Sequence, residues 1–283
     1  MSGNQALGCA IFGYVAIVDD ETRLIDRARD GDEAALSRLV ESYAPRILRF
    51  GQKLCGATAD AEDVMQQSLL TVMSHIGDFR GDSHFTTWLF SIARNHCLKL
   101  HTRGDAAHAR EPIETAERVT TPSRLAPDEA VSQEQLESAL DGAIEALEPS
   151  QREVLVLRDV EGLSAPEVAE TLGVSVDAVK SRLHRARKAL REQLTPWLEQ
   201  SAPSAACPDV VDLLSRYQEG DVTSEACHVM QAHVDGCPQC AKRCHSLRGV
   251  LAACNAAPVP ALSEDLKKAV KEQVRRSLRR QRG

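Results

Sequence analysis

The feature that most limits the fold is a short stretch, residues 162–191, whose pattern predicts two helices joined by a tight turn. Ser164 can cap the first helix, Pro166 fits its first turn, and Gly173 is a residue type that ends helices. Ser175 can cap the second helix. Apolar residues then recur there at steps of three and four: Val176, Val179, Leu183, Ala186 and Leu190. The stretch therefore predicts a helix-turn-helix with one buried face.

The second predicted helix is strongly basic, although the chain has a formal net charge of −7. A helix that enters the DNA major groove needs an apolar side, residues that reach base edges, and cations that neutralise phosphates. The expected base contacts are Lys180, Ser181, Arg182 and Arg185. The expected phosphate contacts are Arg187, Lys188 and Arg191. The alternative is a solvated basic helix in a bundle, which the preceding cap-and-turn pattern disfavours.

Composition predicts a helical protein of about two domains. The chain has 283 residues, of which 43% are hydrophobic and 4% aromatic, so a packed core is expected and a β-sandwich is disfavoured. We therefore expect an all-α fold. No apolar run approaches the ~20 residues of a membrane span, and the apolar stretch Ala6–Val18 has no basic leader. These features favour a cytoplasmic protein that does not bind membranes.

Changes in composition divide the chain. Prolines and acids replace large apolar residues after residue 103, and positions 104–148 contain eleven acidic and three basic residues, which is typical of a linker. The predicted parts are an unassigned extension (1–20), a helical domain (21–103), an acidic linker (104–135), a helix-turn-helix domain (136–200), a cysteine-rich module (207–254) and a basic tail (255–283).

Several motifs in the helix-turn-helix domain resemble region four of the extracytoplasmic-function bacterial sigma factors, which binds the minus-thirty-five promoter element. They are Gln151–Arg158, Glu161–Ser164, Val168–Gly173 and Val179–Arg187. Two departures stand out. Asp177-Ala178 occupies a place where the family commonly has Gly-Thr, and Ala165 one where it often has an aromatic residue. The carboxylate of Asp177 would repel a phosphate there, while Ala165 only changes local packing.

The N-terminal domain resembles sigma region two in the segments Asp60–Gln66, Phe79–Gly81, Phe85–Leu89 and Ile92–Asn95. The resemblance implies that the chain binds the RNA polymerase core, at the clamp helices of its largest subunit and at its flap. It places Asp60, Asp63 and Gln66 in polymerase docking. It places Arg80, His84, Trp88, Arg94 and Asn95 at the minus-ten element of promoter DNA.

Promoter opening itself requires a base to leave the stack, and a protein pocket with aromatic walls can accept it. The loop Gly81–Phe85 could form such a pocket, with His84 exposed to the base. Trp88 has helical spacing with Phe85 and Leu89, which favours a place in the core over a base contact. Asp63 and Gln66 could equally be a solvated helix face.

The cysteine-rich module has the spacing of a metal site. Three thiols and one imidazole, from Cys207, His233, Cys237 and Cys240, would make a closed tetrahedral Zn²⁺ site. The fourth ligand could also be Cys227 or Cys244, and a set of buried thiols without metal is the simpler alternative. The spacing resembles the zinc-binding anti-sigma fold, which implies contact between this module and the sigma domains. The surplus thiols, among them Cys254, could sense oxidants or bind copper or cadmium.

We therefore expect an alternative sigma factor, which is a polymerase subunit and not an enzyme, whose cysteine-rich module gates its DNA-binding domains by metal or thiol state. No nucleophile–base set or phosphate-binding glycine loop is found in the sequence. Two other classes stay open. One is a helix-turn-helix regulator that acts without polymerase core, and the other is a metal-sequestering or redox-sensing protein whose helices bind a protein partner.

Overall fold

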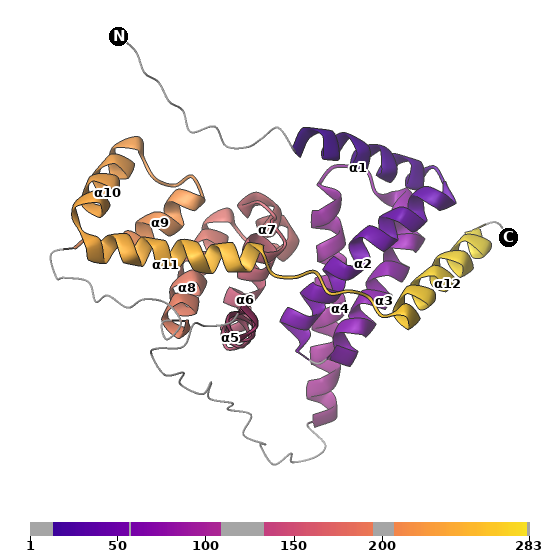
Figure 1. Cartoon of the computed structure of the whole chain (residues 1–283). Helices are drawn as coiled ribbons and strands as arrows, with labels where there is room; N and C mark the ends of the chain where they lie inside the picture. Colours follow the sequence, from indigo (N-terminus) through magenta and orange to yellow (C-terminus); the bar gives the residue numbers. More distant parts are fainter. Residues whose placement is uncertain (1–13, 57, 109–132, 195–206, 282–283) are drawn as a thin grey trace, which may run out of the picture.

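A computed structural model describes residues 14–56, 58–108, 133–194 and 207–281. Within these ranges all regular structure is helical and no strand occurs, which confirms the predicted all-α fold. Figure 1 shows two groups of helices, α1 to α4 together with α12, and α5 to α11. The predicted extension up to residue 13, most of the acidic linker and residues 195–206 lie outside the described residues.

The first group, which we call the N-terminal bundle, contains α1 (Tyr14–Arg29), α2 (Glu33–Cys55), α3 (Thr58–His75), the short η1 (Ile76–Asp78) and α4 (Phe85–His108). Helix α2 begins where the Asp32 side chain accepts hydrogen bonds from two backbone N–H groups. Gly51 lets α2 approach α3, because a Cβ there would lie 3.0 Å from Ala61 Cα. A disulfide joins Cys55 of α2 to Cys97 of α4. The sequence did not predict this pair.

The helix-turn-helix domain contains α5 (Gln133–Glu145), α6 (Pro149–Leu155), the π-helical turn η2 (Val156–Val160), α7 (Ala165–Leu172) and α8 (Val176–Gln193). Ser164 and Glu167 form a reciprocal capping box at the start of α7. Gly173 ends α7 at φ 67°, a conformation that favours glycine. Ser175 caps α8 through the backbone N–H of Ala178. The predicted caps and turn are therefore confirmed.

The cysteine-rich module contains α9 (Val210–Gln218), α10 (Ser224–Gly236) and α11 (Pro238–Asn255). Its small apolar cluster includes Val210, Leu214 and Leu247. The far end of α11 belongs to the main core through Val250 and Cys254. The module is thus packed onto the rest of the chain.

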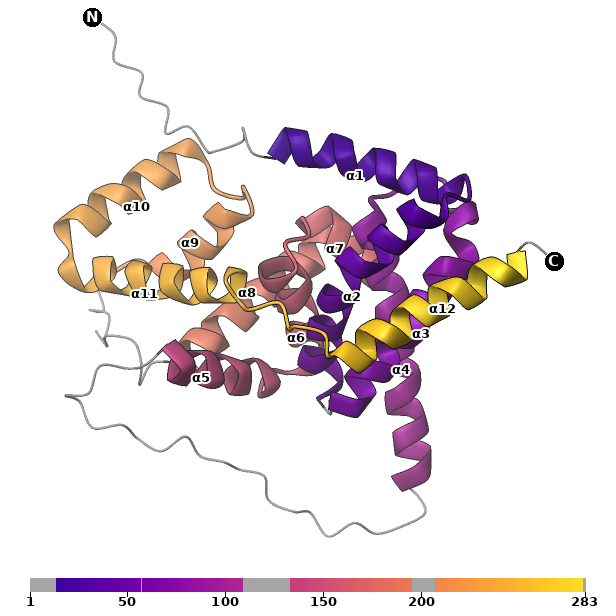
Figure 2. The same cartoon turned by 45° about the vertical axis from the view of Figure 1, so that its right-hand side comes forward.

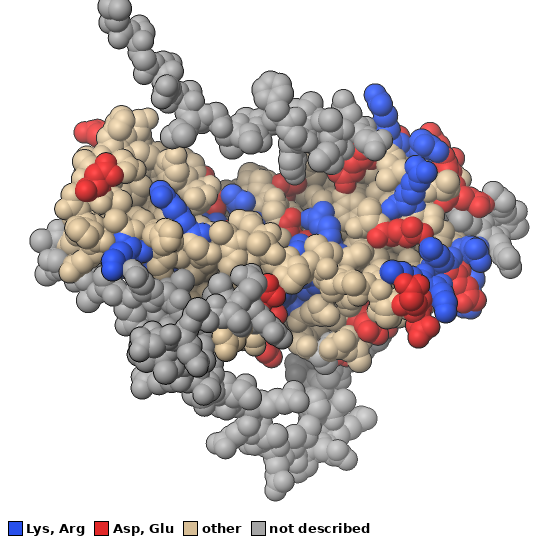
Figure 3. Space-filling view, in the orientation of Figure 1, with Lys and Arg blue, Asp and Glu red and all other residues tan. Residues whose placement is uncertain are grey.

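A connecting segment, residues 256–263, leads from α11 to α12 (Glu264–Gln281). Figures 1 and 2 both place α12 beside the N-terminal bundle, and it packs on α2 and α3. Its Val270 and Val274 are buried in the main core. Figure 3, in the orientation of Figure 1, shows charged side chains of both signs gathered at the end of the molecule where α12 lies. Within the described ranges, no helix combines the length and hydropathy needed to cross a bilayer.

Candidate functional site

The predicted recognition helix α8 presents only part of its basic surface to solvent. Its buried face contains Val179, Leu183, Ala186 and Leu190, as predicted. Of the predicted DNA contacts, Ser181, Arg185 and Lys188 are exposed, while Lys180 and Arg182 are partly buried. Arg191 is partly buried as well, and Arg187 is buried.

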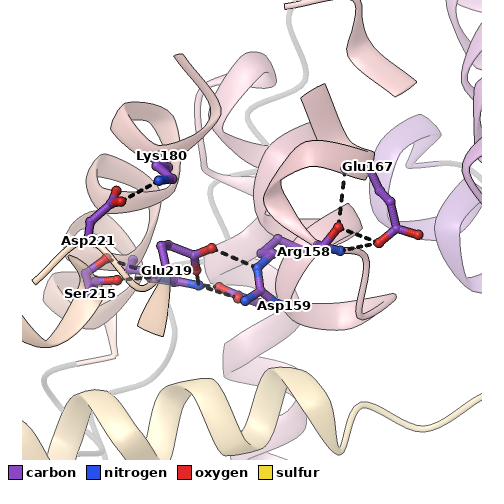
Figure 4. Close-up of polar contacts among 9 residues, drawn as sticks. Arg158, Asp159, Glu167, Lys180, Ser215, Glu219 and Asp221 are labelled. Atoms are coloured by element: carbon purple, nitrogen blue, oxygen red, sulfur yellow. Dashed lines mark hydrogen bonds and ion pairs between the residues drawn. The ribbon is translucent and has the colours of Figure 1, made fainter. Parts of the chain in front are cut away.

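Helix α9 of the cysteine-rich module lies against α8 and supplies acidic partners to it. Lys180 Nζ lies 2.5 Å from Asp221 Oδ1, just beyond α9 (Figure 4). His184 Nδ1 lies 3.3 Å from Asp212 Oδ1 on α9. One side of the predicted DNA-reading helix therefore faces carboxylates of its own chain.

Arg187 corrects the sequence prediction of a phosphate contact. Its side chain is 2% exposed, because the helix face that carries it turns inward under α9. The guanidinium donates to Asp159 at 2.7 and 2.9 Å, and to Glu219 at 2.8 Å. Arg158 also binds Glu219, at 3.0 Å (Figure 4). In this arrangement Arg187 joins the helix-turn-helix domain to the cysteine-rich module.

Electrostatic interactions keep the buried side chain of Arg187 in its charged form. Burial alone would lower the pKa of the Arg187 guanidinium, but its hydrogen bonds and charge interactions with Asp159 and Glu219 outweigh burial and raise that pKa. Arg187 also donates to Ser215 on α9 at 3.2 Å. Sequence reasoning missed this network because an Asp and a Glu that are sixty positions apart carry no signal of a shared partner.

The four predicted metal ligands come together in the cysteine-rich module. One potential ligand atom from each of Cys207, His233, Cys237 and Cys240 lies within 4.8 Å of the others. Cys207 Sγ is 3.9 Å from Cys237 Sγ, and His233 Nε2 is 3.2 Å from Cys240 Sγ. His233 lies in the last turn of α10, Cys237 joins the two helices, and Cys240 lies in the first turn of α11, so the α10–α11 junction presents three of the four.

The donor chemistry of this cluster fits Zn²⁺, which takes thiolate and imidazole ligands in a tetrahedron. The pKa of the Cys237 thiol is lowered, mainly because Cys237 Sγ accepts a hydrogen bond from the backbone N–H of Cys240. Burial, helped by the neighbouring thiols, raises the pKa of Cys240 to about 12. The alternative fourth ligands, Cys227 and Cys244, lie outside this four-residue cluster.

A cavity of about 440 Å³ lies at the predicted base-binding loop. Its walls include Tyr43, Phe79 and Phe85 from the N-terminal bundle. Glu161 and Glu167 of the helix-turn-helix domain close the other side. The helix-turn-helix domain therefore borders the cavity at this loop, while Gly81, Asp82 and His84 stay exposed.

The predicted minus-ten residues lie in different surroundings. Arg80, His84 and Asn95 are exposed. Trp88 is half-buried against Phe79 and Phe85, with ring centroids 5.2 and 5.7 Å away, which agrees with the core alternative. Arg94 is bound to Glu153 of α6 at 3.0 Å, so it contacts the helix-turn-helix domain here. The structure therefore does not bring these five residues onto one open surface.

The predicted polymerase-docking residues lie on α3. Asp60 and Asp63 are exposed, and Gln66 is partly buried. The Gln273 side chain of α12 donates to Gln66 Oε1 at 3.5 Å. The basic tail therefore contacts the predicted docking face, which the sequence did not specify.

A second buried ion-pair cluster joins the N-terminal bundle to the helix-turn-helix domain. Glu161, whose side chain has no exposed area, binds Arg46 at 3.1 Å and Arg49 at 2.9 Å. Arg49 also donates to the backbone oxygens of Val160 and Ala257, at 3.3 and 2.7 Å. The motif Glu161–Ser164 was a point of resemblance to sigma region four, but it gave no signal for this contact.

Comparison with protein families gives three matches in chain order. Residues 39–106 match "Sigma-70 region 2", residues 137–190 match "Sigma-70, region 4", and residues 207–241 match "Putative zinc-finger". The matches coincide with the N-terminal bundle, the helix-turn-helix domain and the metal-ligand cluster.

Similar proteins extend these matches. The RNA polymerase sigma-H factor of Pseudomonas aeruginosa is 31% identical over 200 residues, which are 65% of this chain and 98% of that protein. The RNA polymerase sigma factor CarQ of Myxococcus xanthus is 35% identical over 173 residues, 60% of this chain and 95% of that protein. A solved structure of CnrH in complex with the cytosolic domain of CnrY has a TM-score of 0.45 and 25% identity, covering 62% of this chain and 96% of that one.

Regions two and four in one helical chain define a transcription initiation factor, a class that acts without catalysis of its own. Because relatives at least 30% identical are matched over two thirds or more of their length, the chain belongs to the extracytoplasmic-function RNA polymerase sigma factors. Its cysteine-rich module is an additional domain with the residues of a zinc finger.

Proposed function

We propose that this chain brings the RNA polymerase core to particular promoters, opens them, and is held inactive by its own cysteine-rich module. The observation that carries the proposal is the position of the recognition helix α8. Its outer residues Ser181, Arg185 and Lys188 face solvent, whereas its flank meets acidic residues on α9 and just beyond it. A basic helix that binds DNA is expected to be blocked by carboxylates on that flank.

In the active state, α8 enters the major groove at the minus-thirty-five element. Lys180, Ser181, Arg182 and Arg185 lie on the first turns of α8, which are the turns that reach base edges in helix-turn-helix proteins. Lys188 contacts a phosphate. Arg187 has a structural task instead, because it is buried.

At the minus-ten element, the exposed Arg80, His84 and Asn95 contact the separated strand. Arg94 joins them once it leaves Glu153. Trp88 serves as a wall of the aromatic cluster that supports the loop. The flipped base enters the cavity beside Phe79 and Phe85 after the helix-turn-helix domain has moved away.

On the polymerase, Asp60, Asp63 and Gln66 of α3 dock on the clamp helices of the largest subunit, and the helix-turn-helix domain docks on the flap. The exposure of Asp60 and Asp63 supports this assignment. Helix α12, which touches Gln66, must shift for docking.

Zn²⁺ would be held by Cys207, His233, Cys237 and Cys240 and would supply a structural cross-link between the start of α9 and the α10–α11 turn. Loss of the ion, thiol oxidation, or replacement by copper or cadmium would change how α9 is held against α8. The cysteine-rich module thereby senses metal or thiol state and gates transcription. The protein acts in the cytoplasm, where the polymerase is.

The proposal is tested by in-vitro transcription with purified core enzyme, the full zinc-loaded chain, and a promoter obtained by selection from random sequence. Replacing both carboxylates that face α8, Asp212→Asn with Asp221→Asn, is expected to raise transcript yield several-fold. Glu225→Gln is the matched control, because it removes an exposed acid at the first turn of α10. It should leave the yield unchanged.

Two outcomes would overturn the proposal. If core enzyme and chain produce no transcript with any variant, the proposed sigma function is refuted. If transcripts form but the transcript yield is the same for all variants, both with and without a zinc chelator, the proposed gating by the module is refuted.

A further inference from the structure

One short turn carries two acidic side chains that bind arginines of two different domains. Asp159 of η2 and Glu161, the residue that directly follows η2, are separated by one residue. Asp159 binds Arg187, which in turn binds the cysteine-rich module. Glu161 binds Arg49 of the N-terminal bundle. The turn η2 thus lies between two ion-pair clusters.

The first cluster is closed off from water. The side chains of Arg187, Asp159 and Glu219 are 2%, 6% and 4% exposed. Glu219 receives a second arginine, Arg158, which also belongs to η2. Undocking the module would remove Glu219. Arg158 and Arg187 of the helix-turn-helix domain would then have only one carboxylate of this cluster, that of Asp159.

The second cluster has a buried arginine, Arg49, which donates hydrogen bonds to three other residues. Arg49 is 8% exposed and donates to Glu161, to the backbone of Val160 and to the backbone of Ala257 in the connecting segment. Arg46 binds both the carboxylate and the backbone oxygen of Glu161. The bundle, the turn and the segment that follows the module therefore meet at one guanidinium.

Buried ion pairs are costly to break singly, because the partner that stays behind remains in a low-dielectric site without its counter-charge. The turn that carries both carboxylates is bonded to itself, with Glu161 N donating to Val156 O at 2.9 Å and Leu163 N to Leu157 O at 3.0 Å. Displacing one carboxylate of so short a turn shifts the other.

We infer that η2 couples two movements, so that undocking of the cysteine-rich module and separation of the N-terminal bundle from the helix-turn-helix domain occur as one cooperative opening. The ion pairs Glu219–Arg187–Asp159 and Glu161–Arg49 form the coupling path. The coupling belongs to the free chain and goes beyond the gating proposed above, which requires only that α9 leaves α8.

The test measures two distances in the full zinc-loaded chain by energy transfer between dyes on non-natural residues. One dye pair, at the exposed positions 38 and 170, reports the bundle against the helix-turn-helix domain. The other, at positions 170 and 229, reports the helix-turn-helix domain against the module. Glu219→Gln removes a charge only at the module end of the path. It is expected to increase the open population at both dye pairs, each by at least about tenfold.

Glu153→Gln is the matched control. It breaks the ion pair with Arg94, which also joins the bundle to the helix-turn-helix domain but involves no side chain of η2. This variant should loosen the first dye pair and leave the second unchanged. The coupling is refuted if Glu219→Gln opens only the module, leaving the distance between bundle and helix-turn-helix domain as in the unaltered chain.

Hydrogen exchange of the unaltered chain decides the matter if Glu219→Gln fails to fold. A single cooperative opening predicts that amides of α9 at the α8 contact and amides at the packed α4–α7 contact become exposed together, with one opening rate. Separate opening rates for the two contacts would contradict the coupling. Neither measurement uses DNA or polymerase, so failure here is distinct from failure of the proposed function.

Discussion

At the scale of single residues, the chain uses arginine for two tasks that its sequence does not distinguish. Arg185 and Arg187 stand two positions apart on the same basic helix. Arg185 is exposed, whereas Arg187 is enclosed by Asp159 and Glu219. A helix of 3.6 residues per turn sends such neighbours to different faces, and what covers each face then decides its role.

Arg187→Ala is expected to lower the free energy of unfolding by about 3–5 kcal/mol, because it leaves two buried carboxylates without their cation. Arg185→Ala, on the exposed face, should change it by about 0.5 kcal/mol or less. Denaturant titration followed by circular dichroism measures both. Equal effects of the two variants would contradict the buried role of Arg187.

Cys240→Ser is expected to abolish stoichiometric zinc binding, because it removes the one fully buried thiol of the four-residue cluster. Cys227→Ser, outside the cluster, should retain one zinc ion per chain. Elemental analysis after dialysis against trace chelator gives the stoichiometry. Retention of zinc by Cys240→Ser would reassign the ligands, with Cys244 the next thiol on α11.

At the scale of elements, the sequence was sufficient where the signals are local. Ser164, Gly173 and Ser175 mark the ends of α7 and α8 through hydrogen bonds within a few residues, and the structure has these ends where they were predicted. The spacing of His233, Cys237 and Cys240 is also local, and these ligands cluster as expected.

Contacts between distant elements could not be predicted in this way. The pairing of Arg49 with Glu161 joins positions 112 apart, and that of Gln66 with Gln273 joins positions 207 apart. Such pairs depend on how whole domains dock, and one sequence carries no periodicity that reports docking. For the same reason Arg94 and Arg187 were expected to meet DNA but are bound within the chain.

Helix α12 supplies a test at this scale. Val270 is 2% exposed in the core between α12 and the bundle, so Val270→Asp places a carboxylate where it has no partner and should detach the helix. Core polymerase is then expected to bind the full chain several-fold more tightly, because Gln66 becomes free. Lys268→Asp, at a position on α12 whose side chain is 78% exposed, is the control and should have little effect. Weaker polymerase binding by Val270→Asp would mean that α12 assists docking.

At the scale of the whole molecule, the structure is a closed arrangement of a sigma factor. The helix-turn-helix domain borders the loop cavity of the bundle, the cysteine-rich module covers one flank of α8, and α12 lies on α2 and α3 (Figure 2). Part of each predicted contact surface meets another part of the chain, through Arg94, Gln66 and Lys180. We therefore expect that transcription by this protein requires opening of this arrangement.

Promoter opening by the assembled complex tests the central claim most directly. A fluorescent base analogue in the minus-ten element of a selected promoter brightens when its base leaves the stack. We predict brightening only when core polymerase and the chain are both present, and more of it with Asp212→Asn and Asp221→Asn together than with the unaltered chain. A duplex that stays closed with core polymerase and this double variant, while the chain alone still binds the duplex, would contradict the account.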